Sequence, residues 1–217
     1  MCRLVLRVKK QPQPIDRNLS CAGACQRPFF RIYDDILSYA ESIQHYIDSE
    51  ALAGVGELYY PIRLKPRGAN RLNVLVQNGV NHIEIRNVDI NLFAPQGIDA
   101  RDLQFIEMLL LFLVSEPSAR LSPKMQDVAV QNFKNAALFD IDAARITLPD
   151  GTSLSAREAG LNILKRMKAF YSESEFTAAS ALGEMLSYQE EKLTVPEMRY
   201  AERAASQFKD SYLVKTP

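Results

Sequence analysis

The sequence predicts an α+β fold, with two strands early in the chain and a helical C-terminal half. Two segments, 57–65 and 82–86, alternate apolar and polar residues with the period of a strand. From residue 99 onward, apolar residues recur at helical spacing behind helix start signals. The 217 residues suffice for one domain or for part of a larger one.

Composition and charge argue against several classes of protein. Hydrophobic residues make up 47% of the chain and charged residues 24%, which are ordinary values for a soluble globular protein. The 26 basic residues balance the 26 acidic ones, so the positive excess of a nucleic-acid-binding protein is lacking. The longest apolar run, Met108 to Val114, is shorter than the roughly 20 residues that cross a bilayer. We expect a cytoplasmic protein with neither nucleic acid nor membrane as a partner.

The first thirty residues differ from the rest, and we expect residues 1–30 to form a poorly ordered leader ahead of a folded portion, 31–217. Six basic residues face a single acid, Asp16, as in a transit peptide. Prolines work against the amphipathic helix that such a peptide needs; they are Pro12, Pro14 and Pro28.

All three cysteines lie in this leader, at Cys2, Cys21 and Cys25. An odd number of cysteines in a chain of this size favours reduced thiols in a cytosol. A zinc site built from Cys21, Cys25 and His45 lacks a fourth ligand and a familiar spacing, so free thiols are the preferred interpretation.

The first predicted helix covers residues 32–49, where apolar residues return every three or four positions. The strand that follows, E-L-Y-Y-P-I-R-L-K at 57–65, has two different faces. Pro61 cannot donate to a strand ladder, which indicates an edge position or a bulge. One face is apolar, with Leu58, Tyr60, Ile62 and Leu64, and the other is polar, with Glu57, Tyr59, Arg63 and Lys65.

A short helix, 71–78, is predicted to end at Gly79, where a positive φ suits glycine. The second strand, 82–86, alternates isoleucine with polar residues. Its polar face carries His82, Glu84 and Arg86. The alternation changes phase at residues 87–88, and we expect a bulge near Asn87.

The remaining elements are predicted from their start signals. Asp99 caps a helix that has Asp102 at its third position, and Ser122 with Pro123 begins the next. We expect the buried stripe of the first of these helices to be Leu103, Ile106, Leu110 and Leu113.

Further along, Asp150 and Gly151 suggest a small hairpin. A capping box at Ser155 predicts the start of a helix that reaches about Tyr171. A second capping box, at Thr194, predicts the start of the last helix. A further helix is expected between them, at 176–192.

The polar faces of the two strands are the candidate site. If these faces lie on one side, carboxylates there could hold magnesium while guanidinium groups grip phosphoryl oxygens. The alternative is a solvated face, which is the commoner case, with cross-strand ion pairs worth only ~0.5 kcal/mol each. No P-loop, dinucleotide glycine fingerprint, HExxH pair or G-x-S-x-G elbow is present to indicate another chemistry.

The residues around these strands resemble a known family. E-L-Y-Y-P-I-R-L-K, then G-V-N-H-I-E-I-R-N-V-D-I-N-L-F-A-P-Q-G-I, then D-L-Q-F-I-E-M-L-L-L-F-L is similar to the later part of bacterial glutamate–cysteine ligase. The resemblance implies a partial glutamine-synthetase-like antiparallel sheet with a helical C-terminal half. Residues 31–217 would be the C-terminal portion of the catalytic domain. The implied activity joins L-glutamate to L-cysteine with ATP, through γ-glutamyl phosphate, as the first step of glutathione synthesis.

The resemblance also implies roles for individual residues. Glu84 matches a carboxylate that ligates an active-site Mg²⁺, and Arg86 matches the catalytic arginine that contacts the transferring phosphate of ATP. Tyr59 matches a tyrosine near the cysteine substrate, and Arg63 is expected to line or support the site. Asp89 and Asn91 are expected to fix the turn after the strand by local hydrogen bonds.

One departure from the family is large. Its members are much longer, and the acidic strand that supplies most of their magnesium ligands has no counterpart here. We therefore expect little or no ligase activity from this chain alone. Two alternatives stay open: a non-catalytic subunit or interaction module that completes the site of a separate N-terminal chain, and a related ligase with another amine acceptor.

Overall fold

The computed structural model describes residues 35–208, apart from 59, 118–119 and 174–178. These residues form two compact units, with the division between Asp89 and Ile90. We call residues 35–89 the N-terminal unit and residues 90–208 the helical unit. The predicted leader and the three cysteines lie outside the described residues, so the boundary at residue 30 stays a prediction.

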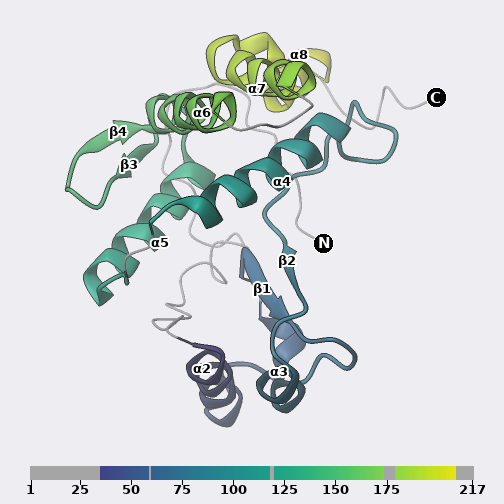
Figure 1. The fold of residues 1–217 in the computed structure, drawn as a ribbon, viewed down its shortest axis with the longest axis vertical. Coiled ribbons are helices and arrows are strands. Elements are labelled where there is room, and N and C mark those ends of the chain that lie inside the picture. Colours follow the sequence, from purple (N-terminus) through teal and green to yellow (C-terminus); the bar gives the residue numbers. More distant parts are fainter. Residues whose placement is uncertain (1–34, 59, 118–119, 174–178, 209–217) are drawn as a thin grey trace. The chain divides into compact units, whose positions relative to one another are not determined.

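The N-terminal unit is a two-stranded ribbon with two helices. Figure 1 shows α2 and α3 next to one another, and residues of the two helices are in contact. In chain order its elements are α2 (Ile36–Asp48), the 3₁₀ turn η1 (Val55–Glu57), β1 (Ile62–Lys65), α3 (Leu72–Asn78) and β2 (His82–Ile85).

Helix α2 forms as its apolar spacing predicts. Its N-cap, Asp35, accepts a hydrogen bond from the backbone N–H of Ser38 at 2.6 Å, which satisfies one of the open donors of the first turn. Tyr39 and Ile43 from its apolar stripe are buried. They pack into the core of the N-terminal unit with Leu52, Leu58 and Leu75.

Strand β1 is shorter than predicted, because the chain from residue 54 to 57 forms a turn instead. Glu57 lies in η1, and its carboxylate accepts a hydrogen bond from the Ala53 N–H at 2.7 Å. The prediction that Glu57 belongs to the polar strand face is therefore wrong. An alternating pattern cannot distinguish a strand from a turn that a local carboxylate closes.

Strand β2 pairs with β1 in antiparallel fashion, with Arg63 opposite Glu84. Pairing ends where the N–H of Arg86 donates to the carbonyl of Pro61 at 2.8 Å. Beyond this point the chain leaves the ribbon, so the bulge expected near Asn87 is wrong. The change of apolar phase marks the end of the strand.

Helix α3 ends at Gly79 as predicted. The N–H of Gly79 donates to the carbonyl of Leu75 at 2.9 Å, which closes the last turn. Gly79 has a φ of +74°, a value that residues with a Cβ rarely adopt. This turn leads directly into β2.

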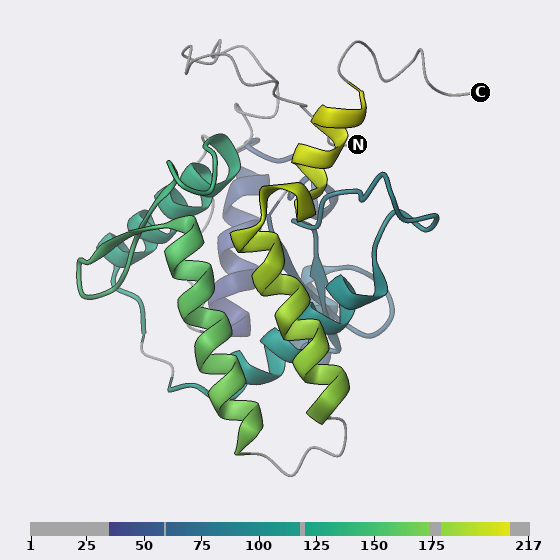
Figure 2. The ribbon, with the colours of Figure 1, turned by 90° about the horizontal axis from the view of Figure 1, so that it is seen from above.

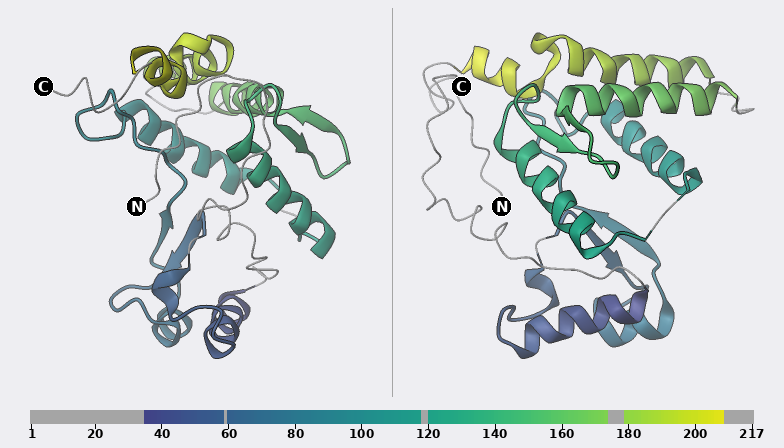
Figure 3. Two further views of the ribbon diagram at one scale, coloured as in Figure 1. Left: turned by 180° about the vertical axis from the view of Figure 1, so that it is seen from behind. Right: turned by 90° about the vertical axis from the view of Figure 1, so that its left-hand side faces the viewer.

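The helical unit contains a small hairpin and the longer helices of the chain. Figures 2 and 3 show α6 and α7 running side by side along most of their length. None of the described helices combines the length and hydrophobicity that a membrane crossing requires. The elements are α4 (Ala100–Ser115), α5 (Pro123–Leu138), β3 (Arg145–Thr147), β4 (Ser153–Ser155), α6 (Ala156–Ser172), α7 (Ala179–Thr194), η2 (Pro196–Met198) and α8 (Tyr200–Gln207).

The core of the helical unit lies among α4, α6 and α7, and it corrects the predicted stripe of α4. Leu103 and Leu113 are 53% and 52% exposed, whereas Met108 and Phe112 are buried. Helix α4 is apolar on more than one side, so periodicity could not fix which face packs. The buried residues of this core are Met108, Phe112, Leu164, Met167, Tyr171, Leu182, Met185 and Leu186.

Most predicted start signals are confirmed. Asp99 and Ser122 cap α4 and α5, and Ser155 forms a complete capping box with Glu158 at the start of α6. The hairpin around Gly151 is also present, as β3 and β4.

The capping box at Thr194 is wrong. Its hydroxyl donates to the carbonyl of Glu190 inside α7, and α8 begins after Arg199 without a side-chain cap. Because α7 continues to Thr194, the threonine hydroxyl bonds to a carbonyl of its own helix and does not cap the next one.

Candidate functional site

The antiparallel pairing of β1 and β2 brings the two predicted polar faces together. In the ladder Arg63 lies opposite Glu84, and Lys65 lies opposite His82. Residues directly opposite each other point to the same side of a sheet, so these four side chains share one face. The prediction that the polar residues of the two strands form one wall is confirmed for them.

Glu84 is the centre of this wall, because three basic side chains surround its carboxylate. Lys65 Nζ lies 2.9 Å from Glu84 Oε2, and Arg63 Nη1 lies 3.7 Å from the same oxygen. Arg86 Nε lies 3.7 Å from the other oxygen, Oε1. One carboxylate on β2 therefore contacts two cations of β1 and one from the residue that follows β2.

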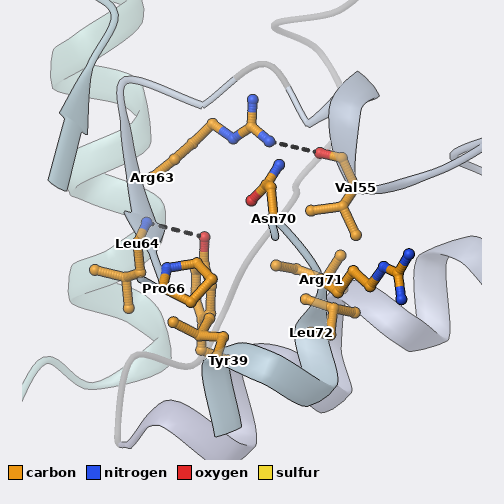
Figure 4. Close-up of a pocket in the computed structure, with 10 residues that line it drawn as sticks. Tyr39, Val55, Arg63, Leu64, Pro66, Asn70, Arg71 and Leu72 are labelled. Carbon is orange, nitrogen blue, oxygen red and sulfur yellow. Dashed lines mark hydrogen bonds between the residues drawn. The ribbon is translucent and has the colours of Figure 1, made fainter. Parts of the chain in front are cut away.

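Arg63 is fixed in place by a backbone carbonyl as well as by Glu84. Its side chain is only 6% exposed, and its Nη2 donates to the carbonyl of Val55 at 2.8 Å. Figure 4 shows this bond at the edge of a small pocket that holds little more than a water molecule. A second bond there joins the Leu64 N–H to the hydroxyl of Tyr39 at 3.4 Å.

Cations gather around Glu84. Among the described residues, three cations lie within 4 Å of its one carboxylate. The hydrogen bond from Lys65 lowers the pKa of Glu84 below its ordinary value, with further lowering by the charges of Lys65, Arg63 and Arg86. Glu84 is thus an anion at neutral pH, and the cations that converge on it suit an anionic group.

A magnesium ion does not fit these surroundings by themselves. Mg²⁺ is bound through oxygen ligands, and Glu84 is the single acid of the wall. Among the described residues, no group of three or more His, Cys, Asp or Glu side chains could hold a metal ion. The role of Glu84 as a magnesium ligand stays a prediction, and we derive no chemistry from a metal here.

The predicted site residues meet different outcomes. Arg63, Glu84 and Arg86 come together as described. Tyr59 lies outside the described residues, so its place near the cysteine substrate stays a prediction. Asn91 makes local hydrogen bonds as expected, because its side-chain oxygen accepts from the Phe93 N–H at 2.9 Å and its own N–H donates to the Gly97 carbonyl at 2.8 Å.

Lys65 is the member of the site whose importance the pattern did not reveal. Alternation correctly placed it on the polar face, but it also placed Glu57 there and gave no reason to choose between them. Its short distance to Glu84 follows from the register of the two strands. Covariation between positions 65 and 84 among related sequences would be the signal for this contact.

A comparison with protein families identifies the segment that carries this wall. The glutamate–cysteine ligase family model matches residues 24–136, which is just over half of the chain. The chain belongs to the glutamate–cysteine ligase family. The matched residues include both strands and every residue of the wall.

Curated relatives of the glutamate–cysteine ligase family are longer proteins. A glutathione biosynthesis bifunctional protein of Listeria monocytogenes is 30% identical over 199 residues, which are 91% of this chain and 26% of the relative. A glutamate–cysteine ligase of Clostridium acetobutylicum is 30% identical over 109 residues, which are 49% of this chain and 23% of the relative. The chain spans about a quarter of the length of these curated relatives.

Two solved structures are similar in fold. A ligase from Francisella tularensis, crystallised in complex with AMP, matches with a TM-score of 0.75 at 16% identity, over 87% of this chain and 43% of that one. A bifunctional glutathione synthetase from Pasteurella multocida matches with a TM-score of 0.65 at 19% identity, over 86% of this chain and 23% of that one. These matches confirm the predicted α+β class, with small antiparallel sheets and many helices.

Proposed function

We propose that this chain provides the phosphoryl-binding wall of a cytoplasmic, ATP-dependent glutamate–cysteine ligase. The observation that supports this most directly is the convergence of Arg63, Lys65 and Arg86 on Glu84, inside the segment that matches the family. Guanidinium and ammonium groups that converge on one point suit phosphoryl oxygens.

The proposed reaction has two steps. An oxygen of the γ-carboxylate of L-glutamate attacks the terminal phosphorus of ATP, the bond from that phosphorus to the bridging oxygen breaks, and ADP leaves. The amine of L-cysteine then attacks the carbonyl carbon of γ-glutamyl phosphate. Inorganic phosphate leaves, the nitrogen loses a proton, and γ-glutamylcysteine is formed.

Within this reaction Arg86 is the proposed catalytic residue. Phosphoryl transfer needs positioning and stabilisation of charge on the moving group more than covalent help from the protein. Arg86 lies at the end of the ladder, where its guanidinium can contact both Glu84 and a bound phosphate. Arg63 lines the site and holds the position of Glu84, and Tyr59 is proposed to contact cysteine.

We further propose that the reaction needs residues beyond those of this chain. The wall has one carboxylate, and the chain covers about a quarter of its curated relatives. An N-terminal chain that brings further carboxylates would complete the site. This makes a non-catalytic subunit or interaction module the second candidate function.

The test is an assay for ATP-dependent γ-glutamylcysteine. We expect little or no product from the purified chain, and product after it is mixed with the N-terminal portion of a relative. Arg86→Gln should abolish the activity of the mixture, whereas Arg67→Gln, at an exposed position, should not. Full activity of the chain alone would contradict the need for a second chain, and an active Arg86→Gln mixture would contradict the role of Arg86.

The identity of the acceptor amine is tested in the same assay. Replacement of L-cysteine by other amino acids should abolish product formation if the chain belongs to a cysteine-specific enzyme. Faster turnover with another amine would favour the related ligase instead.

A further inference from the structure

We propose that Lys65 occupies the place of a metal cation at Glu84 and moves to an anionic ligand when one binds. This inference rests on the proposed function for the identity of that anion, a nucleotide phosphate. It explains why a carboxylate predicted to hold a metal is found among cations instead.

Of the three cations, Lys65 lies nearest to the carboxylate of Glu84. Lys65 Nζ lies 2.9 Å from Glu84 Oε2, nearly 1 Å closer than either arginine nitrogen, at 3.7 Å. This contact is a charge-assisted hydrogen bond, whereas the arginines contribute mainly through their charge. Accordingly, the hydrogen bond from Lys65 is the largest cause of the lowered pKa of Glu84. Lys65 therefore stands where a cation bound to Oε2 would stand.

Lys65 is held by fewer contacts than Arg63, the other cation of β1. Arg63 is held by the Val55 carbonyl as well as by Glu84, and its side chain is buried. For the ammonium of Lys65, Glu84 is the partner found among the described residues. An ammonium on a flexible four-carbon stem can change partner by rotation about single bonds, while a guanidinium held at two points cannot. Of the two cations on β1, Lys65 is therefore the one that can move.

The ammonium of Lys65 opposes a metal ion at Glu84 by its charge. A divalent cation at Glu84 Oε2 would lie next to the ammonium of Lys65, in a place where the lysine side chain is only 15% exposed. Repulsion between like charges is strong where water screens them poorly. Metal and ammonium thus exclude each other at this oxygen. An anion has the opposite effect, because it offers the displaced ammonium a new partner.

The exchange predicts opposite responses to two probes in Lys65→Met. Binding of Mn²⁺ alone should become about fivefold tighter, since a competing cation is removed from a partly exposed carboxylate. Binding of ATP in the absence of metal should become about fivefold weaker, since a phosphate partner is lost. A merely structural role for Lys65 would weaken both.

Two further variants serve as controls. Glu84→Gln in the Lys65→Met background should remove the gain in Mn²⁺ affinity, which locates the bound metal at Glu84. Arg67→Met removes one positive charge from an exposed position two residues away, and it should change neither affinity. Circular dichroism melting curves of all variants show whether the fold is kept.

The measurements are calorimetry for ATP and electron paramagnetic resonance for Mn²⁺, on the purified chain. Mn²⁺ affinity that is unchanged or reduced in Lys65→Met overturns the proposal that Lys65 occupies a metal's place. ATP affinity that is equal in both proteins overturns its movement to the anion. Absence of ATP binding by the wild-type chain contradicts the movement of Lys65. The proposed function is tested separately by the activity of the mixture with an N-terminal portion, and the Mn²⁺ result decides independently whether Lys65 occupies a metal's place.

Discussion

The Tyr200 hydroxyl donates a hydrogen bond to Asp102 Oδ2 at 2.8 Å, across 98 positions of sequence. The other carboxylate oxygen, Oδ1, accepts from Lys192 Nζ at 2.6 Å and from Gln189 Nε2 at 2.8 Å. Tyr188 extends the network, because its hydroxyl lies 2.8 Å from that of Tyr200. One carboxylate therefore joins α4 to α7 and α8.

Asp102→Asn should lower the free energy of unfolding of the helical unit by about 2 kcal/mol, because Lys192 would lose its counter-ion in a place where both side chains are largely buried. Urea denaturation followed by circular dichroism measures the change. Asp127→Asn, on the exposed side of α5, is the matched control and should change stability by less than about 0.5 kcal/mol. Equal effects of the two substitutions would show that the network is not stabilising.

A second prediction concerns acid, and it follows from Asp99. Hydrogen bonds from Arg101 lower the pKa of Asp99 to about 2, against an ordinary value of 3.8. Because the pKa is lower in the folded chain, the unfolded chain binds the proton more readily. The stability that Asp99 contributes is therefore complete above about pH 4 and is lost as the pH falls toward 2.

Asp99→Asn tests this directly, since asparagine also caps helices but does not titrate. Urea midpoints measured from pH 6 to pH 2 should fall less steeply for the variant than for the wild type. Burial raises the pKa of Asp102, but bonds from Gln189, Lys192 and Tyr200 outweigh it and lower the pKa overall, so some acid sensitivity should persist. Identical curves for variant and wild type would rule out a contribution from Asp99.

A third prediction concerns the capping box of α6. The Ser155 hydroxyl accepts from the Glu158 N–H at 3.1 Å, and the Glu158 carboxylate accepts from the Ser155 N–H at 2.7 Å. Ser155→Ala should destabilise the helical unit by about 1 kcal/mol, because a donor of the first turn loses its acceptor. Thermal denaturation compares it with Glu107→Ala, an exposed substitution in the middle of α4 that should have little effect. Equal stability of Ser155→Ala and Glu107→Ala would show that the capping box does not stabilise the helical unit.

A fourth prediction concerns Arg63 as a structural element of the N-terminal unit. Arg63→Met should lower the stability of this unit by about 2 kcal/mol, because the Val55 carbonyl loses its donor and Glu84 loses a counter-ion. Hydrogen exchange resolves the change for residues 35–89 separately. Arg67→Met, at an exposed position nearby, should leave exchange unchanged. Unaltered protection in Arg63→Met would mean that the Val55 bond has no part in holding η1.

The helix caps and the strand faces were predictable from the sequence because local interactions determine them. The caps at Asp99, Ser122 and Ser155 act within one turn, so neighbouring residues suffice to predict them. The strand faces with Arg63 and Glu84 were also predictable, since alternation fixes which side chains point together.

What could not be predicted depends on distant partners. The buried face of α4 is chosen by α6 and α7, because its own sequence is apolar on several sides. The network around Asp102 joins residues that are 87 to 98 positions apart, beyond the reach of any spacing rule. For the site, alternation gave the members of each face, while the short contact of Lys65 with Glu84 required the pairing of the strands.

Pro61 sets the end of the ladder that carries the wall. Its carbonyl accepts from the Arg86 N–H, but its ring nitrogen has no hydrogen to return the bond, so the ladder stops there. Glu84 lies two residues inside the ladder, whereas Arg86 follows the last paired residue. A single imino acid thus places the carboxylate within the paired strands and the guanidinium at their edge.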